Sequence, residues 1–135
     1  NDINDLYVKL LVLERIKNNP QIVFDIIVKQ FDIDDISSSE EYFLEMFGII
    51  IDNAIDAAVL SQDKLVRIIF DEDKVIVQNT FLEVDLDNLE KNKSLKGHKE
   101  RINGLKLLTE LQKASNIIII SKVTDMVSFE MVVGL

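Results

Sequence analysis

The sequence is poor in the residues that form cross-links, thiolate metal sites and flexible linkers. It has no Cys, no Trp, one Pro, one His and four Gly among 135 residues. The absence of Cys excludes disulfides and thiolate chemistry, and a single His excludes a multi-histidine metal site. So few Pro and Gly residues leave little room for a flexible linker. The composition is typical of one compact domain, which at this length buries about two thirds of its unfolded surface.

The chain also has few positive charges and no long apolar run. Its 24 acidic and 15 basic residues give a formal charge of −9, which argues against binding duplex nucleic acid or an anionic membrane through the overall field. No apolar run reaches the 18 residues needed to cross a bilayer, and the first five residues are not typical of a signal peptide. We expect a soluble domain, and because the chain does not begin with Met, we expect it to be part of a longer protein.

Hydrophobic periodicity predicts three helices and five strands. The order is helix, strand, helix, two strands, long loop, helix, two strands. The expected helices cover 6–17, 40–60 and 104–113, the expected strands cover 22–28, 65–70, 74–78, 117–123 and 127–133, and the loop covers 80–101. This order predicts an α/β (α+β) two-layer sandwich, in which helices cover one face of a mixed sheet.

The helix expected over 40–60 combines an apolar stripe with polar residues one turn apart. Its stripe consists of Met46, Phe47, Ile50, Ile51, Ala54 and Ala57 or Ala58. Asn53 and Asp56 share a neighbouring face at positions i and i+3. An unpartnered buried polar group costs about 1 to 3 kcal/mol, so we expect this face to meet a ligand, a metal or a dedicated acceptor. The alternative for Asn53 is a hydrogen-bonded structural residue.

Two further features point towards a nucleotide. Asn79 ends the strand expected over 74–78, where an amide can read the edge of a planar base; the alternative is a turn residue. The loop over 80–101 holds a cluster of cations, and clustered cations before a helix start favour phosphate binding. The alternative for this cluster is a solvated charged loop. Its members are Lys91, Lys93, Lys96, Lys99 and Arg101.

The segment 52–57, Asp-Asn-Ala-Ile-Asp-Ala, resembles the N box of the GHKL ATPase superfamily. The late segment 94–105, Ser-Leu-Lys-Gly-His-Lys-Glu-Arg-Ile-Asn-Gly-Leu, is similar to the last conserved segment of AgrC-type quorum-sensing histidine kinases. The resemblance covers nearly the whole chain in order. It implies the Bergerat fold of GHKL proteins, binding of ATP and Mg²⁺, and no catalytic side chain within this chain.

The resemblance also implies roles for individual residues. Asn53 matches the Asn that coordinates Mg²⁺, with Asp56 and Ala57 following it in the ATP site. Asn79 falls where most members carry the Asp that accepts a hydrogen bond from the adenine amino group. The remaining matches are Ser94, Lys96 and Arg101 in the ATP lid, and Asn103, Gly104 and Leu105 in the second glycine box, which opens the next helix.

Three positions depart from the family pattern. Ile49 stands one turn before Asn53, where gyrase-type hydrolases carry a general-base Glu, so the resemblance implies phosphoryl transfer and not water activation. The first glycine box is reduced to residues 79–81, Asn-Thr-Phe, and Ile102 stands where the second box usually has Gly. Close backbone approach to phosphate relies on Gly.

The resemblance implies that residues 1–20 are the end of a dimerisation helix and that residues 21–135 form the ATP-binding domain of a two-component sensor histidine kinase. This domain would transfer the ATP γ-phosphate to a histidine outside the chain, and a response regulator would receive it next. The full-length protein would be a membrane-anchored homodimer with this domain in the cytoplasm. One alternative is a degenerate GHKL-fold interaction or sensing module with weak or no ATP binding. Another is a regulatory α/β dimerisation domain in which Asn53 and Asp56 are structural.

Overall fold

The computed structural model describes residues 2–29, 40–82, 98–115 and 117–132. Within these ranges it contains three helices and five strands. The helices are α1 (Asp2–Asn18), α2 (Glu40–Ala58) and α4 (His98–Ala114). The strands are β1 (Val23–Val28), β2 (Leu65–Phe70), β3 (Lys74–Asn79), β4 (Ile118–Val123) and β5 (Val127–Val132).

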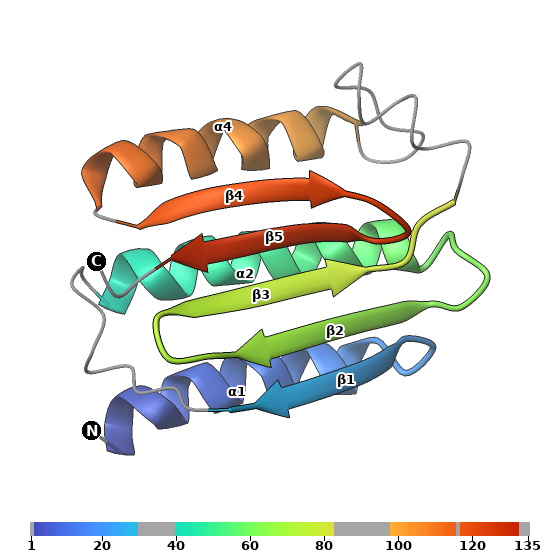
Figure 1. Cartoon of the computed structure of the whole chain (residues 1–135), viewed down its shortest axis with the longest axis horizontal. Coiled ribbons are helices and arrows are strands. Elements are labelled where there is room, and N and C mark those ends of the chain that lie inside the picture. The colour runs from blue at the N-terminus through green and yellow to red at the C-terminus, as the bar shows by residue number, and fades with distance from the viewer. Residues whose placement is uncertain (1, 30–39, 83–97, 116, 133–135) are drawn as a thin grey trace.

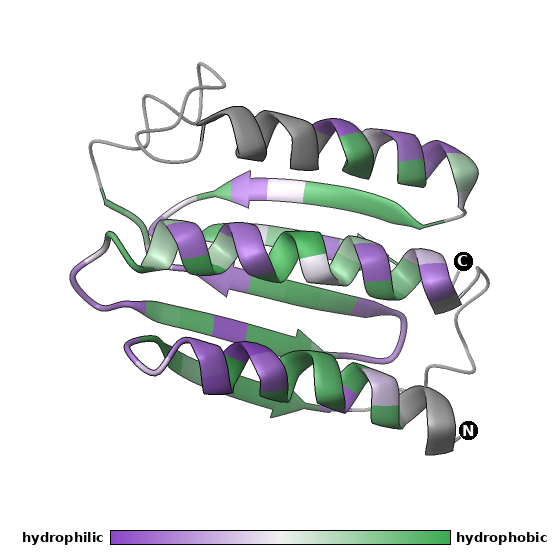
Figure 2. Cartoon of the chain, turned by 180° about the vertical axis from the view of Figure 1, so that it is seen from behind, coloured by the Kyte–Doolittle hydropathy of each residue, from purple (hydrophilic) through white to green (hydrophobic). Residues whose placement is uncertain are grey.

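The five strands form one mixed sheet in the order β1-β2-β3-β5-β4 (Figure 1). The β1–β2 pair is parallel, and every other neighbouring pair is antiparallel. All three described helices lie on the same face of the sheet, as the view from behind shows (Figure 2). The predicted two-layer α+β sandwich, with a mixed sheet and helices on one face, is therefore confirmed.

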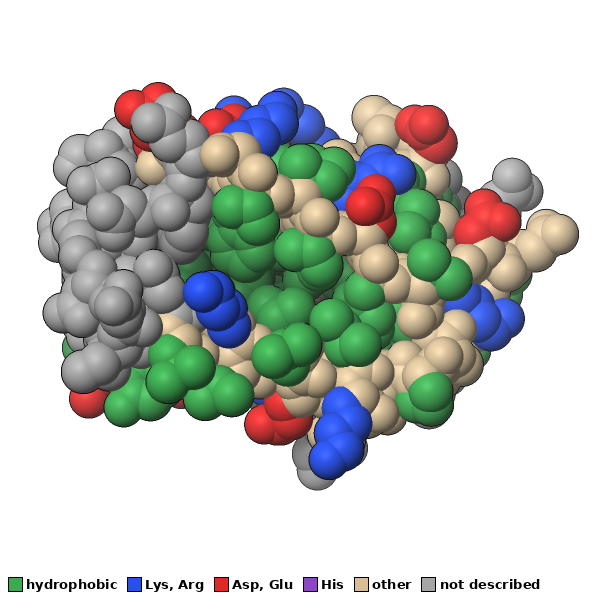
Figure 3. Space-filling model, turned by 90° about the horizontal axis from the view of Figure 1, so that it is seen from below, with side chains coloured by type: hydrophobic (Ala, Val, Ile, Leu, Met, Phe, Trp, Pro, Cys, Tyr) green, Lys and Arg blue, Asp and Glu red, His purple; other side chains and the backbone are tan. Residues whose placement is uncertain are grey.

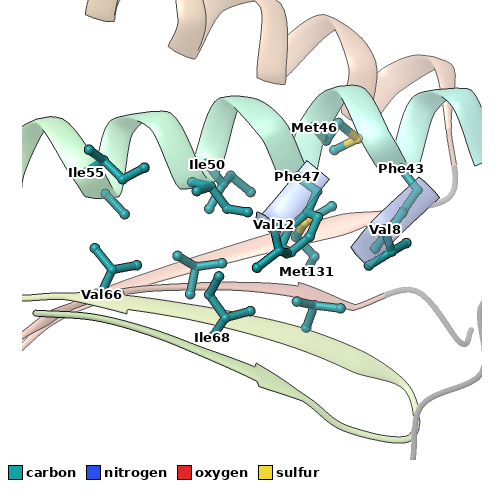
Figure 4. Close-up of a cluster of buried hydrophobic side chains, with 14 of the residues drawn as sticks. Val8, Val12, Phe43, Met46, Phe47, Ile50, Ile55, Val66, Ile68 and Met131 are labelled. Carbon is teal, nitrogen blue, oxygen red and sulfur yellow. The ribbon is translucent and has the colours of Figure 1, made fainter. Parts of the chain in front are cut away.

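The hydrophobic core lies between α2 and the inner face of the sheet (Figure 4). The predicted apolar stripe of α2 is buried in full, with each of its members at most 6% exposed. Phe47 stacks on Phe43 with ring centroids 5.5 Å apart and meets Phe70 edge to face at 5.8 Å. Alternation along β2 and β3 turns every second residue towards α2. Those inner residues are Val66, Ile68, Phe70, Val75, Val77 and Asn79.

Helix α1 packs against α2 through Val8 and Val12, and an ion pair joins the two helices. Arg15 Nε lies 3.2 Å from Asp52 Oδ1, and Arg15 Nη2 lies 3.3 Å from Asp52 Oδ2. Gly48 makes room for this contact, because a Cβ added there would lie 3.3 Å from Arg15 Nη2. Asp52 of the N-box segment therefore faces α1.

Hydrophobic side chains are also exposed on α1 and β1, which form the lower side of the molecule in Figure 1. On α1, Leu6 and Leu10 are each 50% exposed and Leu13 is 57% exposed, at i, i+4, i+7 spacing. On the edge strand β1, Val23 and Val28 are also exposed. Seen from below, hydrophobic side chains gather on this side (Figure 3). Helix α1 is therefore apolar on the face that packs against α2 and on the face that points away.

The last helix differs from its predicted bounds. The sequence pattern places residues 80–101 in a loop and opens the helix near Gly104, but α4 already begins at His98. A Gly within a helix costs only about 1 kcal/mol relative to Ala, and the preceding Lys99, Glu100 and Arg101 are ordinary or good helix formers. None of the helices in the described ranges has the length and apolarity needed to span a bilayer.

Candidate functional site

The polar face of α2 is less buried than its sequence suggests. Asp56 is exposed and Asn53 is half-buried, while Ala57 is 6% exposed and belongs to the buried side. The expectation of a buried polar face on α2 is therefore wrong. The reason is that Asn53 and Asp56 lie at the border between the buried stripe of α2 and its solvent-exposed side. Among the described residues, Asn53 makes no side-chain hydrogen bond.

Asn79 is the buried polar side chain next to this face. It is the last residue of β3, it is 2% exposed, and it points to the helix side of the sheet like Val75 and Val77. Its Nδ2 donates a hydrogen bond to the Thr80 carbonyl at 2.9 Å. No described residue donates to its Oδ1. A buried amide oxygen without a donor costs about 1 to 3 kcal/mol, so this acceptor is a candidate for a donor from outside the described residues.

A network of hydrogen bonds ties the end of β3 to the end of α2. Thr80 Oγ1 lies 2.6 Å from Ser61 Oγ and accepts from the Leu65 amide at 3.0 Å. Ser61 Oγ donates to the Ala58 carbonyl at 2.7 Å and accepts from the Lys64 amide at 3.0 Å. Lys64 has a φ of 51°, a left-handed conformation that non-glycine residues seldom adopt. The bonds made by the Lys64 amide and ammonium to Ser61 stabilise that turn.

Three segments meet at one end of the molecule. The C-terminal end of α2, the C-terminal end of β3 and the N-terminal end of α4 lie at the same end of the two layers (Figure 1). The structure thus places Asn53 and Asn79 on neighbouring elements. Ser94 and Lys96 lie outside the described residues. In the described part of the chain, no three His, Asp or Glu side chains converge as a metal site.

The residues predicted for the second glycine box lie inside α4. Asn103, Gly104 and Leu105 occupy the sixth to eighth positions of a helix that begins at His98, and Arg101, predicted for the ATP lid, occupies the fourth. The expectation that Asn103 to Leu105 open the helix is therefore wrong. The cause is the early start of α4, which places Gly104 within helical backbone.

The sequence pattern missed three residues that shape this region. Ser61 and Thr80 carry the link between α2 and β3, and Arg15 holds Asp52. The available signal for the first two is weak: Ser61 directly follows a predicted helix, and Thr80 follows Asn79 at the end of a predicted strand. No local sequence pattern predicts the role of Arg15, because its partner Asp52 is 37 positions away and their ion pair depends on how α1 and α2 are rotated against each other.

The fold is similar to that of histidine kinase catalytic domains in solved structures. A nucleotide-free crystal form of the catalytic domain of histidine kinase ThkA matches with a TM-score of 0.65 at 17% identity, covering 98% of this chain and 92% of that one. The cytoplasmic segment of histidine kinase QseC matches with a TM-score of 0.61 at 12% identity, covering 95% of this chain and 72% of that one. No protein-family model matches, and no curated protein sequence matches. At such low identity the likeness establishes the fold: this chain has the fold of histidine kinase catalytic domains.

Proposed function

We propose that the chain is the ATP-binding catalytic domain of an AgrC-type sensor histidine kinase, which transfers the γ-phosphate of ATP to a histidine on a dimerisation domain. The observation that carries the proposal is the buried Asn79 amide, with an oxygen that no described residue pairs, beside the Asn53 helix in a fold of this kind. The N-box resemblance of residues 52–57 supports the same reading. Phosphoryl transfer of this type depends mainly on positioning and charge neutralisation.

The chemistry of the Asn79 amide suits the edge of an adenine base. The amide nitrogen is engaged by the Thr80 carbonyl, so the oxygen is the group available to a ligand. A hydrogen-bond acceptor in this position suits the exocyclic amino group of adenine. Because the amide is neutral, it accepts that bond without the cost of burying a charge.

The described residues also fit Mg²⁺ at Asn53. Its amide oxygen is a hard ligand, its side chain is half-buried, and no described residue forms a hydrogen bond with that side chain. Bound Mg²⁺ would neutralise phosphate charge. One turn earlier, the apolar Ile49 packs against the core and offers no base for a water molecule. Ser94, Lys96 and Arg101 are proposed for the ATP lid, and Asn103, Gly104 and Leu105 for the phosphate end of the site.

The exposed face of α1 supports a contact with the dimerisation domain. We place the end of a dimerisation helix in residues 1–20, and Leu6, Leu10 and Leu13 offer a helix-spaced apolar stripe that its own domain leaves exposed. The acceptor histidine would lie on that domain, and the response regulator would take the phosphoryl group from it. Signalling as part of a membrane-anchored homodimer belongs to the same proposal.

The proposal is tested by titrating Mg-ATP into the purified chain with calorimetric detection. Asn53→Ala should weaken binding by about 10-fold to 100-fold, as expected for losing a contact to a charged group worth about 1.5 to 3 kcal/mol. Asn18→Ala is the matched control, because Asn18 is an exposed asparagine at the end of α1 and is none of the residues proposed for the site. This control should bind as the wild type does.

Two outcomes would contradict the proposal in different ways. If the wild type and Asn53→Ala bind Mg-ATP with the same affinity, the proposed role of Asn53 is refuted. Absence of binding by a chain whose circular dichroism spectrum is that of a folded protein would favour the interaction module. The reduced first glycine box, residues 79–81, is the observation that favours that second candidate.

A further inference from the structure

The two hydroxyl groups that join β3 to α2 can satisfy their hydrogen bonds in one consistent way. A hydroxyl carries one proton and can accept two bonds. Ser61 Oγ donates its one proton to the Ala58 carbonyl at 2.7 Å. The Thr80 hydroxyl must therefore donate to Ser61 Oγ across their 2.6 Å contact. Thr80 Oγ1 then accepts from the Leu65 amide at 3.0 Å, and its 3.4 Å contact with the Leu65 carbonyl is secondary. The pair therefore has a fixed polarity.

This pair fixes the backbone of Thr80 from two sides. The Thr80 amide donates to the Leu65 carbonyl at 3.0 Å, while the Thr80 side chain bonds the Leu65 amide and Ser61. Ser61 is 3% exposed and lies at the end of the helix that carries Asn53. The amide, Cα and side chain of Thr80 are therefore held against both β2 and the end of α2, and the place of its carbonyl differs from theirs by a single backbone torsion.

The Thr80 carbonyl decides which way the Asn79 amide faces. A side-chain amide turned by half a rotation exchanges its oxygen and its NH₂ group. The carbonyl only accepts, so it selects the orientation in which Nδ2 lies against it, at 2.9 Å, and Oδ1 faces away. The opposite orientation would set two oxygens against each other in a site that is 2% exposed.

We propose that Ser61 and Thr80 are positioning residues that hold the Asn79 amide with its oxygen towards the base of a bound nucleotide, so that the site prefers a base with an amino group. The preference rests on the proposed function, whereas the orientation of the amide does not. Neither Ser61 nor Thr80 touches the nucleotide in this proposal. They act through the Thr80 carbonyl.

The test compares the wild type with Thr80→Val, which keeps the shape and removes the hydroxyl, and with Thr80→Ser, which restores it. Thr124→Val is the matched control, because Thr124 is exposed in the turn between β4 and β5. One measurement, made without nucleotide, is the solvent exchange rate of the Asn79 side-chain NH₂ protons by NMR. These resonances are assigned by their loss in Asn79→Leu. The other is the ratio of affinities for Mg-ATP and Mg-ITP, whose base carries a carbonyl in place of the amino group.

We expect exchange of the Asn79 NH₂ protons to be about ten-fold faster in Thr80→Val and unchanged in Thr80→Ser, as one weakened hydrogen bond predicts. The preference for ATP over ITP should be about ten-fold in the wild type and below about three-fold in Thr80→Val. Unchanged exchange and an unchanged ratio in folded Thr80→Val would overturn the proposal. If the wild type binds neither nucleotide, the proposed function fails, and the exchange rates alone decide whether Thr80 orients the amide. Ser61→Ala supplies a second variant, with the same expected direction.

Discussion

Replacing Asn79 by Leu separates a ligand-binding role from a structural one. The two side chains have the same branching and the same number of heavy atoms, so the change is mainly the removal of polarity. Asn79 is 2% exposed, and within the described residues its only side-chain hydrogen bond is the one to the Thr80 carbonyl. The substitution loses that bond, which contributes about 0.5 to 1.5 kcal/mol. It also removes a buried oxygen without a donor, which costs about 1 to 3 kcal/mol.

These opposing contributions predict a small change in stability. The free energy of unfolding of Asn79→Leu should differ from that of the wild type by less than about 1 kcal/mol, while the affinity for Mg-ATP falls by at least about ten-fold. Val77→Ala is the matched control on the same inner face of β3. It removes two buried methyl groups and should lower the free energy of unfolding by about 2 kcal/mol.

The assay pairs urea unfolding, followed by circular dichroism, with calorimetric titration of Mg-ATP into the same samples. One result would refute the reasoning: an Asn79→Leu variant that loses more than about 2 kcal/mol of stability but binds nucleotide like the wild type. In that case Asn79 would be a structural residue whose oxygen is satisfied by the chain itself.

Three further predictions concern the packing of α2, each measured by chemical denaturation. Phe47→Ala should destabilise the fold by about 3 to 5 kcal/mol, because the ring is fully buried between two other phenylalanines; a loss below about 1 kcal/mol would contradict that packing. Gly48→Ala should raise the free energy of unfolding by about 0.5 kcal/mol, because the higher helix propensity of Ala contributes about 1 kcal/mol and exceeds the cost of moving the flexible end of Arg15. A lower free energy of unfolding would mean that the Arg15 guanidinium cannot move away from the added methyl group. A double-mutant cycle on Arg15 and Asp52, whose side chains are 21% and 57% exposed, should give a coupling below about 1 kcal/mol that weakens as salt rises; a larger, salt-independent coupling would refute this estimate.

The elements of the fold follow from local pattern to a large extent. Strand β2 has its predicted bounds, and the buried stripe of α2 matches its helical spacing, because both depend on the periodicity of a single segment. The start of α4 does not follow from pattern, since Gly104 lies within the helix and the charged residues before it suit loop and helix alike. The 68% exposure of Val28 cannot be predicted from local pattern either, because it depends on the sheet order, which leaves β1 at an edge.

The candidate site is less predictable than the fold. Asn53 and Asn79 can be proposed from the sequence because one lies in a motif and the other ends a strand. The contact between Ser61 and Thr80 cannot, since they are 19 positions apart and meet only when α2 packs on β3. The half-exposure of Asn53 has the same cause: periodicity defines the faces of a helix, but the depth of each face depends on its neighbours.

The parallel pairing of β1 with β2 has a consequence for the order of folding. Val23 of β1 pairs with Leu65 of β2, and the intervening chain includes all of α2, so this pairing closes a long loop. The β2–β3 and β4–β5 pairs join strands separated by short turns, and they lose far less chain entropy on pairing. The hydroxyl link between α2 and β3 and the Asn79 amide do not include β1. The part of the candidate site that holds Asn79 can therefore assemble before the sheet gains its edge strand, and opening of that edge need not dismantle it.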